Sequence, residues 1–489
     1  LFLLTAPSPR AYAAGRLSVG GGGGGAGPSR YLLILPPFAL LLVVAVFGVN
    51  APFWDEWELV PFIDGVLERG PQFGEFFARH NEHRIFFPKI VFLFSALASN
   101  FNVKVNMYIS WVLMLAMYAC YLLHLKTNIV CKTAPLKVKR LFFGLAAGFC
   151  CFNIIQSENI LWGFQTGFLM TAAFSVICFY CFSRWYTGKK FRYLFISMAS
   201  GFIASFSSMQ GLFIFPAAAG VVFLLFLSGE KPRLKYMLPL VILAIFTFTL
   251  YFYDYSPPVH HGVYFMKSPA RAALSFFMCI GNIFPFRSVI LYLAAGMLIF
   301  ALSASLTVYL IIKKKVAEHI FPLCLIYFGC AFCASIALGR SGMGWQAVLA
   351  SRYTTFSLFI PTGLALMAPA EFNNAAPLTA FNRLVKGSVS LILIVLLSSQ
   401  CFVIPHLMES AALAKTRQAV LRDYKNQTLQ TLQSLYPWPD FDSAYRAIGI
   451  LEKNRWSVFS ERQKRPAPKQ TSAAPARLDF LLLRCKIEQ

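Results

Sequence analysis

Long apolar runs alternate with short polar segments along almost the whole chain. A helix that crosses a membrane needs about 20 mainly apolar residues, because the hydrocarbon core is about 30 Å thick and each helical residue rises about 1.5 Å. Eleven runs are predicted as spans, and none of them contains Asp, Glu, Lys or Arg. They cover residues 31–49, 105–125, 141–156, 165–183, 193–207, 211–228, 236–253, 288–312, 319–338, 354–370 and 387–405. The pattern predicts an all-α polytopic membrane protein with about 11 transmembrane helices.

One further apolar run, residues 85–101, decides the orientation of everything after it. If this run lies along the outer membrane surface, the segments on the cytoplasmic side hold 20 Lys and Arg, against 10 in the outer segments before residue 405. Cytoplasmic loops carry such an excess. If the run spans instead, the basic loops 126–140 and 184–192 move outside, beside a first loop that holds seven of the 20 acids. We therefore predict an interfacial helix, a cytoplasmic N-terminus and an outer C-terminus.

This orientation divides the chain into four regions. Residues 1–30 include six consecutive glycines and are predicted to form a flexible leader. The membrane domain covers residues 31–405, with 50–104 as its first outer loop. Residues 406–460 are predicted to form an outer helical region, and the Pro- and Lys-rich residues 461–489 a disordered tail. A second interfacial helix is predicted at 272–286, in a later outer loop.

The composition excludes an ordinary soluble domain. Of the 489 residues, 57% are apolar and only 13% are charged, whereas about a quarter of a soluble domain is charged. The 44 Lys and Arg exceed the 20 Asp and Glu, giving a formal net charge of +24, an excess also found in nucleic-acid-binding proteins. Here the positive charge lies mostly between apolar runs. We therefore predict a lipid bilayer, and no nucleic acid, as a partner.

Two adjacent acids follow the first predicted span. Asp55 and Glu56 are bracketed by Trp54 and Trp57, and Trp favours the level of the lipid headgroups. A carboxylate held at that depth is partly desolvated, which raises its pKa and its strength as a proton acceptor. Such a group suits general-base catalysis on a hydroxyl acceptor. The same four residues also fit an acidic loop start between two interfacial anchors.

Five polar residues, His80 to Arg84, crowd the end of the same loop. In a helix, His80 and Arg84 would share one face at i, i+4, and the planar guanidinium of Arg84 suits a phosphate. Glu82 and His83 are candidate substrate-binding residues of the same run. The His-x-x-His spacing with Glu82 also permits a metal site, but no further ligand can be named, so a divalent metal is not favoured.

A later outer segment, residues 157–165, closes one span and opens the next. Its candidate substrate-binding residues are Glu158, Asn159, Trp162 and Gln165. A carboxylate, amides and an indole suit hydrogen bonding to a sugar and stacking on its ring. A tight turn with an interfacial Trp has the same composition, so both interpretations stay open.

Two arginines mark the last outer loop before the tail. Arg340 and Arg352 flank a Gly-rich turn that also holds Trp345, a further candidate for substrate binding. Arginines beside flexible backbone at a membrane surface suit the phosphate of a lipid-linked donor. The alternative is that both side chains snorkel and anchor the ends of helices.

The arrangement resembles the GT-C superfamily of integral-membrane glycosyltransferases. The resemblance covers approximately residues 31–460 and rests on the architecture and on three motifs, Trp54-Asp55-Glu56-Trp57, His80 to Arg84 and Arg340 to Tyr353. It implies transfer of a sugar from a polyprenyl-phosphate carrier to a glycan, lipid or protein acceptor on the outer face of a bacterial inner membrane. Asp55 is then the general base, with Glu56 beside it. Arg340, Arg352, Arg84 and His80 are assigned to the donor phosphate on chemical grounds.

Two other functions fit parts of the pattern. A flippase or transporter for a lipid-linked glycan is the main rival, but ion-coupled carriers place ionisable residues within the membrane, and the predicted spans have none. A passive flippase would leave the acids of the first outer loop unexplained. An O-antigen-type polymerase would hold its arginines in a large late outer loop, whereas the loop 339–352 is short.

Overall fold

The computed structural model describes residues 28–128, 134–230, 237–256, 268–371, 380–433, 435–436 and 441–461. Most of the predicted leader and the predicted tail after Glu461 lie outside these residues. Nearly all of the described chain is helical, as the apolar runs predict, and one two-stranded hairpin accompanies the helices.

Seven helical stretches are long and apolar enough to cross a membrane, and each coincides with a predicted span. The helices that form them are α5 (Val103–Asn128), α6 (Ala134–Cys151) continued by α7 (Ser157–Leu161), α8 (Thr166–Gly188), α10 (Ile214–Leu227), α14 (Val289–Ile312), α15 (Ile320–Arg340) and α19 (Ala380–Arg422). The spans around α8 and α15 are 78% and 72% buried, whereas the span of α14 is only 28% buried. Helices α8 and α15 therefore lie at the centre of the bundle, and α14 presents most of its surface to lipid.

The other four predicted spans coincide with shorter helices. They are α1 (Leu35–Phe47), α9 (Phe191–Ser205), α11 (Leu238–Phe252) and α18 (Phe359–Glu371), with 13 to 15 residues each. At about 1.5 Å per residue, such helices extend roughly 20–23 Å, which is less than the hydrocarbon core. The polytopic all-α architecture is confirmed, while the count of eleven spans is supported for seven.

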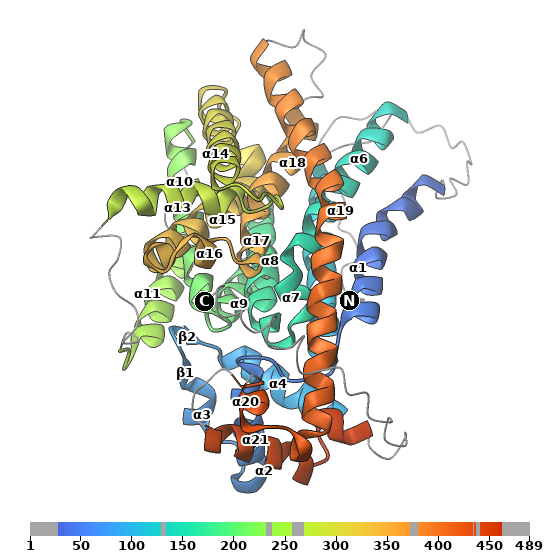
Figure 1. Cartoon of the computed structure of the whole chain (residues 1–489). Helices are drawn as coiled ribbons and strands as arrows, with labels where there is room; N and C mark the ends of the chain where they lie inside the picture. The colour runs from blue at the N-terminus through green and yellow to red at the C-terminus, as the bar shows by residue number, and fades with distance from the viewer. Residues whose placement is uncertain are drawn as a thin grey trace, which may run out of the picture.

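A layer of short helices covers one end of the bundle (Figure 1). It contains α2 (Glu56–Arg69), α3 (Phe73–Phe77), the strands β1 (Arg79–His80) and β2 (His83–Arg84), α4 (Phe86–Ser99), α20 (Leu429–Gln433) and α21 (Phe441–Lys453). The first-loop helices and the C-terminal helices share one core, in which Trp57 and Ile63 of α2 meet Ile448 and Leu451 of α21. Each large side chain buried there contributes roughly 1.5–3 kcal/mol. Helix α4, with 14 residues, is too short to span.

Helix α19 connects the bundle to this layer. Its 43 residues continue through Pro405 without a break in the assigned helix. The boundary predicted at residue 405, between the membrane domain and the outer helical region, therefore lies inside α19. Near its C-terminus, Gln418 donates from Nε2 to the carbonyl of Asn50 at 3.0 Å, which ties the helix to the start of the first outer loop.

The run predicted as a second interfacial helix is partly buried. It forms α13 (Pro269–Gly281), whose first residues are exposed and whose last four are buried against the bundle. Its end crosses α14 where Gly281 faces Gly296, and a Cβ on Gly296 would lie 1.7 Å from the carbonyl oxygen of Phe277. The close approach of two backbones requires glycine at both positions, as is common between membrane helices.

We expect Gly296→Ala to destabilise the protein, because the backbone of α13 must move to admit the methyl group. Overpacking of this kind typically costs about 1–3 kcal/mol. The measurement is the thermal unfolding midpoint in detergent. Gly220→Ala in α10 is the matched control, since a Cβ there would meet the ring of Tyr327 at an ordinary 3.5 Å. Equal midpoints for the two variants would contradict the close crossing.

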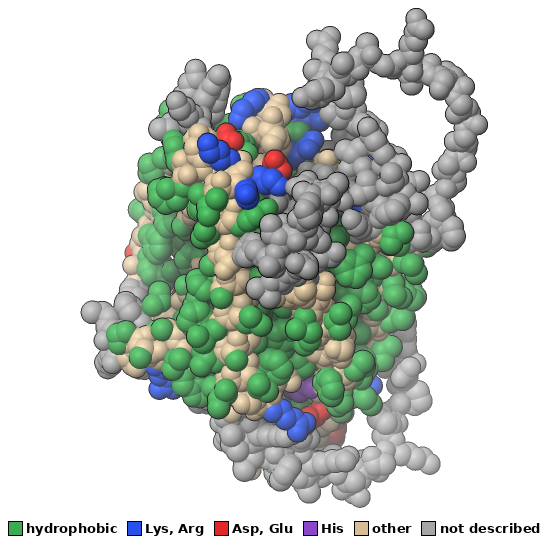
Figure 2. Space-filling model, turned by 90° about the horizontal axis from the view of Figure 1, so that it is seen from above, with side chains coloured by type: hydrophobic (Ala, Val, Ile, Leu, Met, Phe, Trp, Pro, Cys, Tyr) green, Lys and Arg blue, Asp and Glu red, His purple; other side chains and the backbone are tan. Residues whose placement is uncertain are grey.

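The face opposite the short-helix layer is seen in Figure 2. Hydrophobic side chains cover much of it, and Lys and Arg side chains gather mainly at the upper edge of the view, with smaller patches along the lower edge. Exposed large apolar side chains also occur along the outer helices, among them Ile245 and Phe246 of α11 and Ile290 and Leu298 of α14. Contiguous apolar surface of this kind requires a lipid environment, which supports a multi-pass membrane protein.

Candidate active site

Asp55 lies where the chain leaves the bundle and enters α2. Its side chain is 19% exposed, and one carboxylate oxygen is 3.6 Å from Nε2 of His80. The other ring nitrogen of His80, Nδ1, is 2.9 Å from Oε2 of Glu58, one turn along the same helix. His80 therefore connects two carboxylates, and Asp55 is the one beside the bundle.

The imidazole of His80 is held in its charged form. Burial opposes the charge, but hydrogen bonds and attraction from Asp55 and Glu58 outweigh it and raise the pKa of His80 to about 9. His83, the first residue after the turn, behaves in the opposite way, since burial lowers its pKa to about 4. The backbone N–H of Met209 donates to Nδ1 of His83 at 3.3 Å. His83 is therefore neutral, with its proton on Nε2.

The His80 to Arg84 run is a β-hairpin, so the shared helical face considered for His80 and Arg84 does not occur. Strands β1 and β2 pair antiparallel, with His80 opposite His83 and Arg79 opposite Arg84. Asn81 has a φ of 52°, which permits the tight reversal. In this geometry His80 and Arg84 do not share a helical face, and their side chains contact different parts of the molecule.

Arg84 contacts the end of α11. Its guanidinium donates to the carbonyl of Tyr251 at 2.7 Å, to that of Phe77 at 3.0 Å and to that of Tyr253. The side chain is buried and stacks over the ring of Phe77. Its N–H groups thus satisfy backbone oxygens at a helix terminus, so the donor-phosphate role expected for Arg84 finds no support in this geometry.

Glu82, at the tip of the hairpin, pairs with Arg340 from the late outer loop. Nη2 of Arg340 is 2.9 Å from Oε1 of Glu82, across 258 residues of sequence. The same carboxylate oxygen is 3.7 Å from Nε2 of His83. Arg340 is 24% exposed, and a guanidinium has five N–H donors, so one ion pair leaves donors for an anion.

A second ion pair joins two other outer segments. Oε1 of Glu158 is 3.0 Å from Nη1 of Arg352, and Oε2 accepts from the backbone N–H of Arg352 at 2.8 Å and from Ser351 at 2.9 Å. Both charged side chains are one-third exposed. Asn159 is fully buried and donates to the carbonyl of Arg352 and to Thr355, each at 2.7 Å, so it positions this loop.

Three predicted site residues are buried away from the exposed ion pairs. Trp162 is 7% exposed, donates to the carbonyl of Phe53 at 3.1 Å and packs on its ring. Gln165 is 3% and Glu56 is 1% exposed. Oε2 of Glu56 accepts from the backbone N–H of Phe53 at 2.8 Å, and burial raises the pKa of Glu56 to about 8. The buried carboxyl of Glu56 is out of reach of a substrate hydroxyl, which distinguishes it from the partly exposed carboxylate of Asp55.

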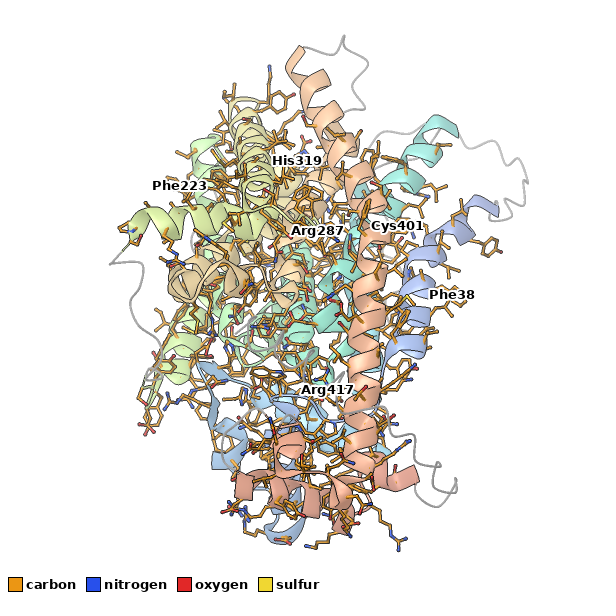
Figure 3. All side chains as sticks on the ribbon, viewed as in Figure 1. Phe38, Phe223, Arg287, His319, Cys401 and Arg417 are labelled. Carbon is orange, nitrogen blue, oxygen red and sulfur yellow. The ribbon has the colours of Figure 1, made fainter. Side chains whose placement is uncertain are left out.

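Sequence reasoning missed two charged residues of this region. Glu58 is the second partner of His80 and is 41% exposed. Arg417 of α19 lies with its guanidinium 4.0 Å from the centre of the Phe53 ring, at the lower end of the bundle in Figure 3. The i, i+3 spacing from Asp55 within a helix is a signal that could have identified Glu58. The amphipathic stretch around Arg417 gave no reason to select that residue.

Trp345 lies beside a further cation. It begins the short helix α16 (Trp345–Val348), and the guanidinium of Arg271 from α13 is 5.1 Å from the centre of its ring. Trp345 is half-buried. Among the described residues, no group of three or more His, Cys, Asp or Glu side chains is placed to hold a metal ion.

Predicted residues, together with Glu58 and Ser351, thus form two partly exposed ion-paired groups at one end of the bundle. One group contains Asp55, Glu58, His80, Glu82 and Arg340, and the other contains Glu158, Ser351 and Arg352. Comparisons with protein-family models, with curated proteins and with solved structures find no match to this chain.

Proposed function

We propose that the protein is a membrane glycosyltransferase that moves a sugar from a polyprenyl-phosphate carrier to a hydroxyl acceptor on the non-cytoplasmic face. The observation that carries the proposal is that one hairpin of the first outer loop contacts both a partly exposed acid, Asp55, and an arginine from a loop far away in sequence, Arg340. Asp55 contacts His80, and the hairpin that holds His80 also holds Glu82, the partner of Arg340. These contacts support the proposal, because the proposed proton acceptor and the proposed anion-binding group both lie against the same hairpin.

In the proposed reaction, Asp55 removes the proton of the acceptor hydroxyl. The acceptor oxygen forms a bond to the anomeric carbon while the bond from that carbon to the carrier phosphate breaks, so the configuration inverts and the lipid phosphate leaves. Asp55 suits this role because it is 19% exposed, whereas Glu56 is almost fully buried. His80 positions Asp55. Glu58, the other partner of His80, is more exposed, so the proton taken up by Asp55 passes through His80 and Glu58 to water.

The arginines stabilise the departing phosphate. Negative charge grows on the carrier as the glycosidic bond breaks, and fixed cationic donors at a membrane interface favour that state over the bound substrate. Arg340 and Arg352 are the accessible candidates, because each retains N–H groups beyond those that face its Glu partner. The half-exposed Trp345 offers a ring face for the sugar or the isoprenoid chain.

The direct test uses the purified protein with a panel of polyprenyl-phosphate sugars. We expect transfer of one sugar to a hydroxyl acceptor, with release of the free carrier phosphate in equal amount, measured with and without a chelator. Movement of the intact lipid across vesicle membranes without cleavage of any member of the panel would instead support a flippase and would contradict the proposal.

Arg340→Ala is expected to lower kcat/KM for the donor about 100-fold, because loss of one transition-state donor typically costs that much. Arg340→Lys keeps the charge but loses the planar fork, so it should recover only part of the activity. Arg287→Ala is the matched control, since Arg287 is an exposed arginine of another predicted outer loop. Steady-state kinetics of carrier release measure all three. Equal kcat/KM for the Arg340 and Arg287 variants would exclude Arg340 from the site.

A further inference from the structure

A polar pocket lies at the end of the bundle opposite to Asp55. It has a volume of about 330 Å³ and is formed where the last turns of α5 and α8 meet the segment that precedes α15. Figure 3 labels His319, the neighbour of one lining residue, in the upper part of the molecule and Arg417 in the lower part. The polar residues that line the pocket are His124, Thr127, Ser183, Arg184, Thr187 and Glu318. The distribution of basic loops predicts that this end faces the cytoplasm.

Arg184 is the cation of this pocket. The guanidinium is half-buried, and its Nε is buried without a hydrogen-bond acceptor among the described residues. Burying such a donor without an acceptor is costly, and a guanidinium suits the paired oxygens of a phosphate. The described part of the chain provides no ion pair between Arg184 and Glu318, although both line the pocket.

The other side of the pocket consists of acceptors. Glu318 is exposed, so its carboxylate lies toward the mouth. Thr187 donates its proton to the carbonyl of Ser183 at 3.0 Å, so its hydroxyl oxygen meets a ligand as an acceptor. Helices α5 and α8 end at the pocket, and the carbonyls of a last helical turn carry partial negative charge. These groups favour an ammonium.

We propose that this pocket binds a phosphoethanolamine group, with the phosphate against Arg184 and the ammonium against Glu318. A simple anion would meet the repulsion of Glu318, and a simple cation that of Arg184, whereas a zwitterion with a phosphate and an ammonium suits both. The lining residues lie in the last turns of two apolar helices and just before a third, where lipid headgroups are expected, so a phospholipid would reach the pocket. This site is independent of the proposed sugar transfer.

The test measures binding of three probes to the full-length protein in detergent, by native mass spectrometry for the lipids and by calorimetry for the soluble compound. The probes are phosphatidylethanolamine, phosphatidylglycerol and soluble phosphoethanolamine. We expect phosphatidylethanolamine to bind about tenfold more tightly than phosphatidylglycerol, which lacks the ammonium and so one charge-assisted hydrogen bond. If soluble phosphoethanolamine binds as tightly as the lipid, the chemistry is supported and the source of the ligand is soluble.

Three variants separate the two contacts. Arg184→Gln should weaken both lipids about tenfold or more, and Glu318→Gln should weaken phosphatidylethanolamine alone. Arg192→Gln is the matched control, because Arg192 is exposed on the same predicted side and does not line the pocket. Equal binding of the two lipids by the unmodified protein would overturn the proposal, as would unchanged binding in Glu318→Gln, whose exposed position leaves the fold intact.

Discussion

Asp55→Asn should abolish sugar transfer while the protein still folds and binds its donor. Loss of a general base typically lowers the rate about 10²–10⁴-fold, and an amide cannot accept the proton of the acceptor hydroxyl. Folding should persist because the side chain is 19% exposed and the amide has the same shape. His80 keeps its shorter contact to Glu58 in the variant. Single-turnover transfer and separate binding of the polyprenyl-phosphate sugar measure the two properties.

A surface variant of the same helix controls for general damage to α2. Glu68 is exposed, lies at the opposite end of α2 from Asp55 and pairs with Lys453 at 2.9 Å, so Glu68→Gln should transfer at the unmodified rate. Glu56→Gln offers a second comparison, since the carboxyl of Glu56 is buried and mostly protonated. Near-normal transfer by Asp55→Asn would remove Asp55 as the base. A rate in Glu56→Gln as low as in Asp55→Asn would transfer that role to Glu56.

The apolar pattern of the chain was sufficient to predict the architecture. The structure has a helix at each of the eleven predicted runs. The length of the apolar runs predicts this, because backbone polar groups in a bilayer must be paired within the helix. The pattern could not predict where helices stop. Pro405 does not end α19, and α13 enters the bundle because Gly281 and Gly296 allow two backbones to meet. Such contacts depend on residues that are distant in sequence.

The candidate residues were easier to select than their partners. Residue type and position at span ends indicated Asp55, Arg340 and Arg352, and the structure pairs the two arginines with Glu82 and Glu158. The conformation of the His80 to Arg84 run could not be read from the sequence, because an i, i+4 spacing places two side chains on one face only where the backbone is helical. A tight turn at Asn81 changes the direction of alternate side chains, so Arg84 satisfies backbone carbonyls while His80 faces Asp55.

The charged state of His80 should make stability depend on pH. The folded-state pKa is about 9 and the ordinary value is 6.5, so the stabilisation is complete below pH 6.5 and is lost as the pH rises through 9. The full effect is on the order of 3 kcal/mol, since each pKa unit corresponds to about 1.4 kcal/mol. His80→Gln should lack this decline. Thermal unfolding in detergent between pH 6 and 10, compared for the two proteins, measures the difference.

Neighbouring groups also titrate, and comparison with Glu56→Gln separates their contributions. The raised pKa of Glu56, about 8, makes the folded state bind an extra proton between pH 4.5 and 8, so this group also lowers stability as the pH rises, but only up to pH 8. The lowered pKa of His83 acts below pH 6.5 with the opposite sign. Burial lowers the pKa of Lys89 to about 8, so this group raises stability with increasing pH between pH 8 and 10.5 in all three proteins. Between pH 8 and 9, the unmodified protein and Glu56→Gln should therefore lose stability relative to His80→Gln, and by the same amount. Parallel curves for all three proteins would mean that His80 is neutral in the folded state and does not bridge Asp55 and Glu58 as an imidazolium.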